Sequence, residues 1–253
     1  MRIKLIVAYD GTNYNGYQSQ VNGIAVQDVL EKAIADLFGE KIRTLGASRT
    51  DTGVHAEGNV AVFDVESRIE PSRIAFALNA RLPQDIRILD SARVPDDFHP
   101  RFQRTIKTYQ YHVLNRKFPD PLRRNTEMHY YYDLDEEAMN KACGILIGEH
   151  DFASFAASGY SSKTTVREIY DANVVRSGDR ITFTITGNGF LYNMVRIIAG
   201  TLLEIGAGKY GPEHMKNVLE AENFDMWDGG EKKKDGKIAR MDLQDLLLLR
   251  DDS

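Results

Sequence analysis

The chain is poor in cysteine, tryptophan and proline, with one, one and seven of these residues among 253. A single cysteine, Cys143, excludes an internal disulfide, which fits a reducing compartment. Because Cys143 lies in an apolar, helix-like segment, we expect it in the core rather than as a reactive thiol. No apolar run approaches the roughly 20 residues that a membrane helix needs, and residues 1–4 begin a strand-like pattern rather than a signal peptide. These absences favour a cytoplasmic globular protein without a membrane partner.

A basic excess is also absent, since 32 Lys and Arg residues stand against 37 Asp and Glu residues, for a net charge of -5. This balance argues against a nucleic-acid partner, because phosphate binding depends on Lys and Arg. The distribution of charge along the chain argues the other way. Residues 101–124 hold seven basic residues and one acid, Asp120, whereas the charged residues of 204–231 are mainly acids. A basic face and an acidic face would orient an RNA, and the alternative is ordinary surface charge. The seven basic residues are Arg101, Arg104, Lys107, Arg116, Lys117, Arg123 and Arg124.

Apolar periodicity predicts an α+β protein. We expect strands at 3–9, on both sides of Asp51, and at 86–94, 109–114, 128–133, 168–175 and 181–186. We expect helices at 26–38 with Gly39 as the stop, from Pro71, at 135–147, and from Phe190. The alternation predicts two halves of similar order, residues 1–100 with the Asp51 loop and residues 101–253, with a boundary near Pro95 to Arg104.

One carboxylate lies among small residues between two strand-like runs, in the segment Gly46-Ala47-Ser48-Arg49-Thr50-Asp51-Thr52-Gly53-Val54-His55-Ala56. Small residues let a backbone approach a ligand closely, and Gly53 can supply a positive φ that its β-branched neighbours resist. If the segment is extended, Arg49 and Asp51 point the same way, because side chains two apart share a face. The pattern is typical of a catalytic loop.

Two interpretations of this segment need residues that the chain lacks. Asp51-Thr52-Gly53 matches the Asp-Thr-Gly of an aspartic protease, in which two carboxylates share one proton. That site needs a second such loop or a symmetric dimer, and the sequence holds no other Asp-Thr-Gly. His55-Ala56-Glu57 matches half of a zinc deaminase site, which also needs Pro-Cys-x-x-Cys. With one cysteine in the chain, no such metal site is expected.

Several segments occur in an order that resembles the pattern of a known family. They are Arg49-Thr50-Asp51-Thr52-Gly53-Val54-His55, Phe98-His99-Pro100-Arg101-Phe102 with Lys107-Thr108-Tyr109-Gln110-Tyr111, His150-Asp151-Phe152-Ala153-Ser154-Phe155 with Lys163-Thr164-Thr165-Val166-Arg167, and Gly189-Phe190-Leu191-Tyr192-Asn193-Met194-Val195-Arg196. The first resembles the active-site signature of the tRNA pseudouridine synthase A family, and the last resembles its arginine helix. The ordered set spans residues 1 to about 210 and is far more specific than any one motif.

This resemblance implies a fold and a reaction. The fold is the pseudouridine synthase fold, in which two similar α/β halves form one mixed, mainly antiparallel sheet, flanked by helices and with a central cleft. The family converts uridine to pseudouridine at positions 38, 39 and 40 of the tRNA anticodon stem-loop, as a homodimer whose subunits both touch one tRNA. The reaction moves the uracil attachment from N1 to C5 without oxidation, so we expect neither a cofactor nor a metal.

The resemblance also implies roles for single residues. Asp51 is the expected nucleophile, and Arg196, on a helix with a narrow polar stripe, is its expected cationic partner. Tyr109 matches the tyrosine that stacks on the target base, and Arg49 matches the residue that replaces an extruded nucleotide. Alternatives are a turn-forming Asp51 and an Arg196 that reaches solvent. Further expected RNA contacts are His55, Arg101, Lys107 and Lys163.

The last residues depart from the family segment Thr-Ala-Pro-x-x-Gly-Leu-x-Leu. Leu246 and Leu248 can stand for its leucines, but Asp245 replaces the glycine and the Ala-Pro is absent. Because glycine adopts geometries that Asp adopts less readily, the wall of the active site is expected to differ. A second hypothesis is therefore a non-catalytic tRNA-binding protein on the same scaffold. The complete set of Arg49, Asp51, Tyr109 and Arg196 favours the enzyme.

Overall fold

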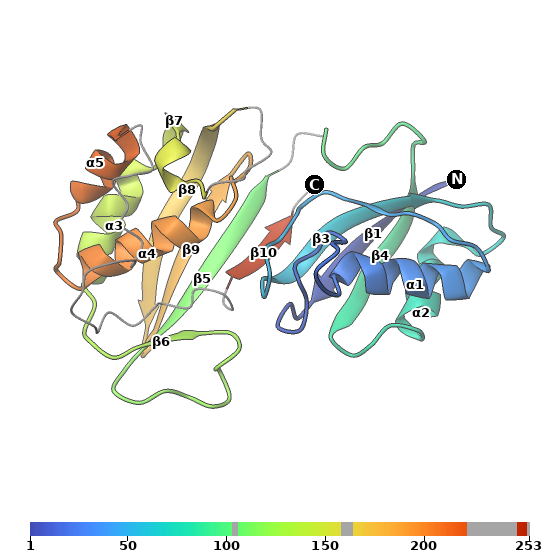
Figure 1. Cartoon of the computed structure of the whole chain (residues 1–253), viewed down its shortest axis with the longest axis horizontal. Helices are drawn as coiled ribbons and strands as arrows, with labels where there is room; N and C mark the ends of the chain where they lie inside the picture. Colours follow the sequence, from blue (N-terminus) through green and yellow to red (C-terminus); the bar gives the residue numbers. More distant parts are fainter. Residues whose placement is uncertain (103–105, 158–163, 222–246, 252–253) are drawn as a thin grey trace. The chain divides into compact units, whose positions relative to one another are not determined.

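The structure, a computed structural model, describes residues 1–102, 106–157, 164–221 and 247–251. The chain divides into two compact units, Met1–Thr108 with Leu247–Ser253, and Tyr109–Leu246 (Figure 1). The division into residues 1–100 and 101–253 stays a prediction about domains. Arg104, at the end of the expected boundary, lies outside the described residues.

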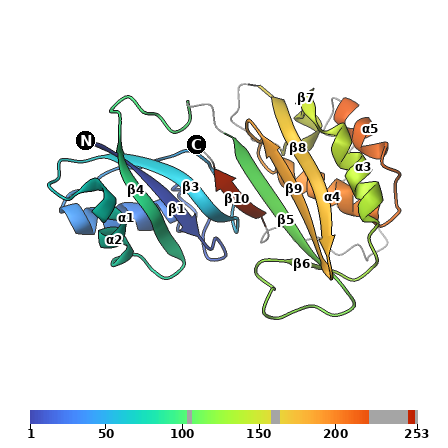
Figure 2. The same cartoon turned by 180° about the vertical axis from the view of Figure 1, so that it is seen from behind.

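The first unit contains a sheet in the order β4-β1-β3-β10, with β2 paired to β3. Strand β1 is antiparallel to β3 and β4, whereas β10 is parallel to β3. Helices α1 and α2 contact each other on one side of this sheet (Figures 1 and 2). The elements of this unit are β1 (Arg2–Tyr9), α1 (Val26–Phe38), β2 (Leu45–Gly46), β3 (His55–Asp64), α2 (Pro71–Asn79), β4 (Ile86–Val94) and β10 (Leu247–Asp251).

The second unit contains strands in the order β5-β9-β8-β7, with β6 paired to β5. Helices α3 and α4 pack together, and α4 lies across this sheet (Figure 1). The described elements of this unit are β5 (Lys107–Asn115, which begins at the end of the first unit), β6 (Met128–Tyr130), α3 (Glu136–Ile145), β7 (Gly148–Asp151), η1 (Ala153–Phe155), β8 (Val166–Ser177), β9 (Arg180–Gly187), α4 (Met194–Gly206) and α5 (His214–Glu220). The predicted α+β class, with mixed and mainly antiparallel strands, is confirmed.

Local patterns explain the elements that the sequence predicted well. Helix α1 has the expected bounds and ends at Gly39, which adopts φ 78° in the left-handed region that favours glycine. Strand β1 alternates half-buried and buried residues, because successive side chains point to opposite faces of a sheet. Cys143, on α3, is fully buried as expected. Within the described ranges, no helix combines the length and apolar character needed to cross a bilayer.

Two expected elements differ from the structure by three or more residues at one end. Helix α4 begins at Met194 rather than at Phe190, because Asn193 adopts a left-handed conformation with φ 57° and the Met194 amide closes a turn onto the Leu191 carbonyl. Strand β6 ends at Tyr130 rather than at residue 133. Here Nδ2 of the Asn115 side chain donates to the carbonyls of residues 130 and 132, which takes the place of further strand pairing.

Candidate active site

Asp51 lies in the connection between β2 and β3 of the first unit. Its neighbours Ser48 and Thr50 are buried, whereas Arg49 is exposed and Asp51 is half-buried. This alternation agrees with an extended loop in which Arg49 and Asp51 share a side. The loop therefore has an inner side of small polar residues and an outer side that carries a cation and a carboxylate.

Buried hydrogen bonds fix the inner side of this loop. The Tyr9 hydroxyl, on β1, lies 2.7 Å from Thr50 Oγ1. Asn59, on β3, is fully buried; its Oδ1 accepts from the Ser48 amide and its Nδ2 donates to the Ser48 carbonyl, both at 3.2 Å. If the loop were displaced, each of these buried groups would lose its hydrogen-bond partner, at a cost of about 1–3 kcal/mol per group. These bonds therefore select one loop conformation.

A turn follows Asp51 and brings the chain into β3. The Val54 amide donates to the Asp51 carbonyl at 3.2 Å, and Gly53 adopts φ 77°, which confirms the expected positive φ. A type II turn needs such a residue at its third position. The Gly53 amide also donates to the Tyr14 carbonyl at 3.3 Å, so a second loop supports the turn.

That second loop, residues 10–17, packs against the Asp51 loop at close range. The Tyr17 amide donates to the Thr50 carbonyl at 3.2 Å. A Cβ on Gly16, which has φ 73°, would lie 2.3 Å from the same carbonyl oxygen. A Cβ on Gly46 would lie 2.2 Å from an atom of the Tyr17 ring, so a glycine is needed here to leave room for that ring. Both glycines are needed for the two loops to meet.

His55 lies inside the first unit and is 8% exposed. Its Nδ1 is 3.0 Å from Asp10 Oδ1 and 3.2 Å from the Gly11 amide. If Nδ1 carries a proton, it donates to Asp10; if it does not, it accepts from the Gly11 amide. In either state the ring is hydrogen-bonded to the second loop. Burial opposes ionisation of Asp10, but hydrogen bonds from Thr12 and the nearby His55 lower the pKa of this carboxyl overall. The expected phosphate contact of His55 stays a prediction.

Three cations border the Asp51 loop within the first unit. Arg101 Nε donates to the Gly46 carbonyl at 2.8 Å, and Lys107 Nζ lies 3.5 Å from the Ala47 carbonyl. Arg49 supplies the third charge. Burial and, after it, the charge of Arg49 lower the pKa of the Arg101 guanidinium, which places the two cations in one electrostatic neighbourhood. The structure thus brings Arg49, Arg101 and Lys107 together around the loop.

Tyr109 and Arg196 belong to the second unit. Tyr109, on β5, is 9% exposed, and its ring is nearly perpendicular to that of Phe190, with a centroid distance of 5.1 Å. Arg196 lies in the first turn of α4 and is 8% exposed, so the alternative of an arginine that reaches solvent is wrong. Its pairing with Asp51 stays a prediction, because the two residues lie in different units. Lys163 lies outside the described residues.

The sequence-based reasoning missed the residues that hold the Asp51 loop. The sequence-based prediction assigns no role to residues 10–16, and it singles out neither Tyr9 nor Asn59. Asn59 carried a signal, since it is an amide within a run of small and apolar residues that forms a mostly buried strand. Among the described residues, no group of three or more His, Cys, Asp or Glu side chains is placed to hold a metal ion.

Comparison with known proteins identifies the family. The profile of the tRNA pseudouridine synthase family matches residues 5–103 and 142–237. Over 219 residues, 87% of this chain and 90% of the relative, the chain is 48% identical to tRNA pseudouridine synthase A of Acetivibrio thermocellus. It is also 44% identical to tRNA pseudouridine synthase A 2 of Clostridium perfringens over 234 residues, which cover 92% and 93% of the two chains. The chain therefore belongs to the tRNA pseudouridine synthase A family of tRNA-modifying isomerases.

Proposed function

We propose that this enzyme converts uridine to pseudouridine at positions 38, 39 and 40 of the tRNA anticodon stem-loop, with Asp51 as the nucleophile. The observation that carries the proposal is the way Asp51 is held. It is a half-buried carboxylate on a loop whose inner side is bound to β1 and β3. A fixed nucleophile reacts faster than a mobile one, because its orientation does not have to be found during each turnover.

In the proposed reaction, the bond from ribose C1′ to uracil N1 breaks, the ring turns, and C1′ bonds to C5. The proton on C5 is lost and N1 gains one, so the product is an isomer of uridine. Asp51 attacks either C1′ or C6 of the ring, and both routes need an ionised carboxylate. Arg196 is the proposed cation that favours ionisation of Asp51, because a nearby positive charge stabilises a carboxylate. Tyr109 is proposed to stack on the uracil.

The remaining proposed contacts bind the RNA. Arg49 is proposed to fill the space left by the extruded nucleotide, and Arg101 and Lys107 to contact phosphates, which their positions beside the Asp51 loop support. For His55 and Lys163 the family resemblance alone supports a phosphate contact. The same resemblance supports a homodimer as the active form. The single cysteine favours the cytoplasm as the location of the protein.

The proposal is tested with unmodified tRNA transcripts and mapping of pseudouridine by carbodiimide-dependent primer-extension stops. We expect wild-type protein to produce stops at positions 38–40, and Asp51→Asn to produce none while it keeps its affinity for tRNA. Glu57→Gln is the matched control, because it neutralises an exposed carboxylate only six residues further along the chain. It is expected to retain activity.

Two outcomes would contradict the proposal. Stops that persist with Asp51→Asn would exclude the carboxylate as nucleophile. Binding of tRNA without stops by the wild-type protein would favour the non-catalytic alternative. Stops at other uridines would contradict only the proposed positions 38–40 and would still show pseudouridine synthase activity.

A further inference from the structure

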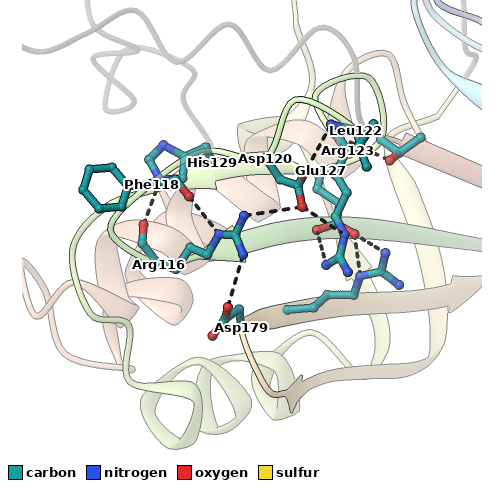
Figure 3. Close-up of polar contacts among 10 residues, drawn as sticks. Arg116, Phe118, Asp120, Leu122, Arg123, Glu127, His129 and Asp179 are labelled. Atoms are coloured by element: carbon teal, nitrogen blue, oxygen red, sulfur yellow. Dashed lines mark hydrogen bonds and ion pairs between the residues drawn. The ribbon is translucent and has the colours of Figure 1, made fainter.

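The segment between β5 and β6, residues 116–127, forms a loop in the second unit (Figures 1 and 3). It lies between the two stretches that the family profile matches. The loop is rich in charge, with Arg116, Lys117, Arg123 and Arg124 against Asp120 and Glu127. The directions in which these side chains point decide which charges the loop presents to solvent.

Glu127 points inward. Its side chain is fully buried, and its Oε1 accepts from Arg180 Nε at 2.7 Å and from Arg180 Nη2. Arg123 Nη1 lies 3.5 Å from the other oxygen. A buried carboxylate with two guanidinium partners is neutralised where it lies and adds little negative potential to the surface.

Asp120 also binds within the loop. Its Oδ2 lies 3.4 Å from Arg116 Nη2 and 3.7 Å from Arg123 Nε, and its Oδ1 accepts from the Leu122 amide at 2.9 Å (Figure 3). Arg116 also reaches Asp179, at 3.6 Å. Both acids of the loop are therefore compensated by arginines.

Hydrogen bonds to backbone carbonyls give the loop a defined shape. The amides of residues 126 and 127 both donate to the Arg123 carbonyl at 2.9 Å, as in a helical turn. Arg124 Nη1 donates to the Pro121 carbonyl at 2.6 Å, and Arg116 Nε donates to the Phe118 carbonyl at 2.8 Å. A loop ordered in this way holds its outer side chains in place and loses less entropy when it binds a partner.

The outer side of the loop is cationic and aromatic. Lys117 and Arg124 are exposed, and Phe118 is 68% exposed, with Lys117 Nζ 5.4 Å from the centre of its ring. Strand β6 then leads to Tyr131 and Tyr132, which are 54% and 70% exposed. Positive charges beside exposed aromatic faces fit an RNA, because phosphates bind the former and bases stack on the latter.

This surface is remote from the base-stacking tyrosine. Tyr109 lies near the start of β5, and Asn115, at the end of the strand, is six positions further along the chain. At about 3.3 Å per residue, the strand spans about 20 Å between them. A nucleotide bound at the loop is therefore not the nucleotide that stacks on Tyr109.

We propose that the loop of residues 116–127 is a second RNA-binding surface, which contacts tRNA outside the anticodon stem-loop. Lys117 and Arg124 bind phosphates, and Phe118 offers a stacking face to an unpaired base. The inference rests on the proposed function in one respect, since it takes the target base to lie in the anticodon stem-loop.

The test compares two RNAs, a full-length tRNA transcript and a hairpin of the anticodon stem-loop alone. For the double variant Lys117→Ala/Arg124→Ala, we expect the Kd for tRNA to rise roughly five- to tenfold and the slope of log K against log salt to shrink by roughly two, because two phosphate contacts are lost. The Kd for the hairpin should not change. Phe118→Ala should raise the Kd for tRNA at least about fivefold.

Two matched variants complete the test. Lys141→Ala/Lys216→Ala removes the same charge from exposed positions on α3 and α5 and should leave the Kd for tRNA unchanged. Lys117→Arg/Arg124→Lys keeps the charge and should restore affinity. An unchanged Kd for tRNA in the first double variant, or an equal loss with the hairpin, would overturn the inference.

The alternative partner for this loop is another protein rather than RNA. If Lys117→Ala/Arg124→Ala or Phe118→Ala changes the sedimentation of the protein alone and not its Kd for tRNA, the loop is a protein interface and the inference fails. Failure of the proposed function is seen separately, as absence of pseudouridine with wild-type protein, and the binding comparison still decides the role of the loop.

Discussion

The hydroxyl of Tyr9 lies 2.7 Å from Oγ1 of Thr50, and both side chains are buried. Strand β1 thus holds the residue that precedes Asp51. The amide of Asn59 lies 3.5 Å from the same hydroxyl, which joins β3 to the contact. The position of the candidate nucleophile therefore depends on interior polar groups that do not themselves carry the chemistry, and these can be changed without altering Asp51.

Tyr9→Phe should slow the reaction without weakening tRNA binding. The variant removes the hydroxyl partner of Thr50 and keeps the ring, so we expect a free energy of unfolding lower by about 1–2 kcal/mol. A misplaced nucleophile lowers kcat, here by roughly tenfold, and leaves KM nearly unchanged. Single-turnover pseudouridine formation and urea unfolding measure the two effects.

Tyr14→Phe is the control for this prediction. The Tyr14 hydroxyl donates at 2.8 Å to Asp85, which is not a residue of the Asp51 loop, so its removal should affect stability without the loss in kcat. Equal kcat values for Tyr9→Phe and wild type would show that the Tyr9 hydroxyl does not position the loop.

Gly16→Ala should disrupt the active site far more than Gly39→Ala. Both glycines have positive φ, 73° and 78°, so both substitutions pay a backbone cost of about 1–2 kcal/mol. A Cβ at Gly39 meets nothing within 4 Å, whereas one at Gly16 would lie 2.3 Å from the Thr50 carbonyl oxygen. We expect Gly39→Ala to retain activity and Gly16→Ala to lose roughly a hundredfold in kcat, because the Asp51 loop must move. Similar activities for the two variants would show that the loops separate at little cost.

Local signals account for the parts of the fold that the sequence predicted. Helix α1 has apolar residues at helical spacing and a glycine at its end, and both features lie within 14 residues. Helix α5 was missed: it has seven residues, and its buried Met215 and Val218 make it depend on packing rather than on a local pattern. Strand β10 was missed for a similar reason, because it forms by pairing with His55 and its neighbours on β3, far away in sequence.

The candidate site likewise has one part that the sequence predicted and another that depends on contacts between distant residues. The motif around Asp51 is contiguous, so the catalytic candidate was visible in the sequence. The contact of Tyr9 with Thr50 joins residues 41 apart, and that of Tyr9 with Asn59 joins residues 50 apart. Spacing within one element carries no information on such pairs, because they exist only after β1 and β3 have paired.

Cys143 should resist thiol reagents in the folded protein. The thiol is fully buried, and burial, with a smaller contribution from the charge of Asp171, raises its pKa to about 12. Since the thiolate is the reactive form, we expect native protein to react with iodoacetamide at least roughly a thousandfold more slowly than protein unfolded in urea. Mass spectrometry follows the single label, because the chain has one cysteine. Rapid labelling of the native protein would show that α3 opens readily.

His112 should make the protein less stable in mild acid. Burial and, after it, the charge of Arg180 lower the pKa of this imidazole below its ordinary value of 6.5, and Glu127 opposes them. The folded state therefore disfavours the protonated ring, whereas the unfolded chain takes up the proton as the pH falls through 6.5. The stability that comes from the neutral ring is complete above that pH and is lost progressively as the pH falls to the lower pKa of the folded state.

The comparison that isolates this effect is urea unfolding of wild type and His112→Gln at about pH 7.5 and about pH 5.5. Glutamine can keep a hydrogen bond to Thr182, whose Oγ1 lies 3.1 Å from His112 Nδ1, and it does not titrate. Other titrating groups contribute equally to both proteins, so wild type should lose more of its free energy of unfolding between the two pH values than the variant. If both lose the same amount, the protonated ring is tolerated beside Arg180, and the charge of Glu127 outweighs burial.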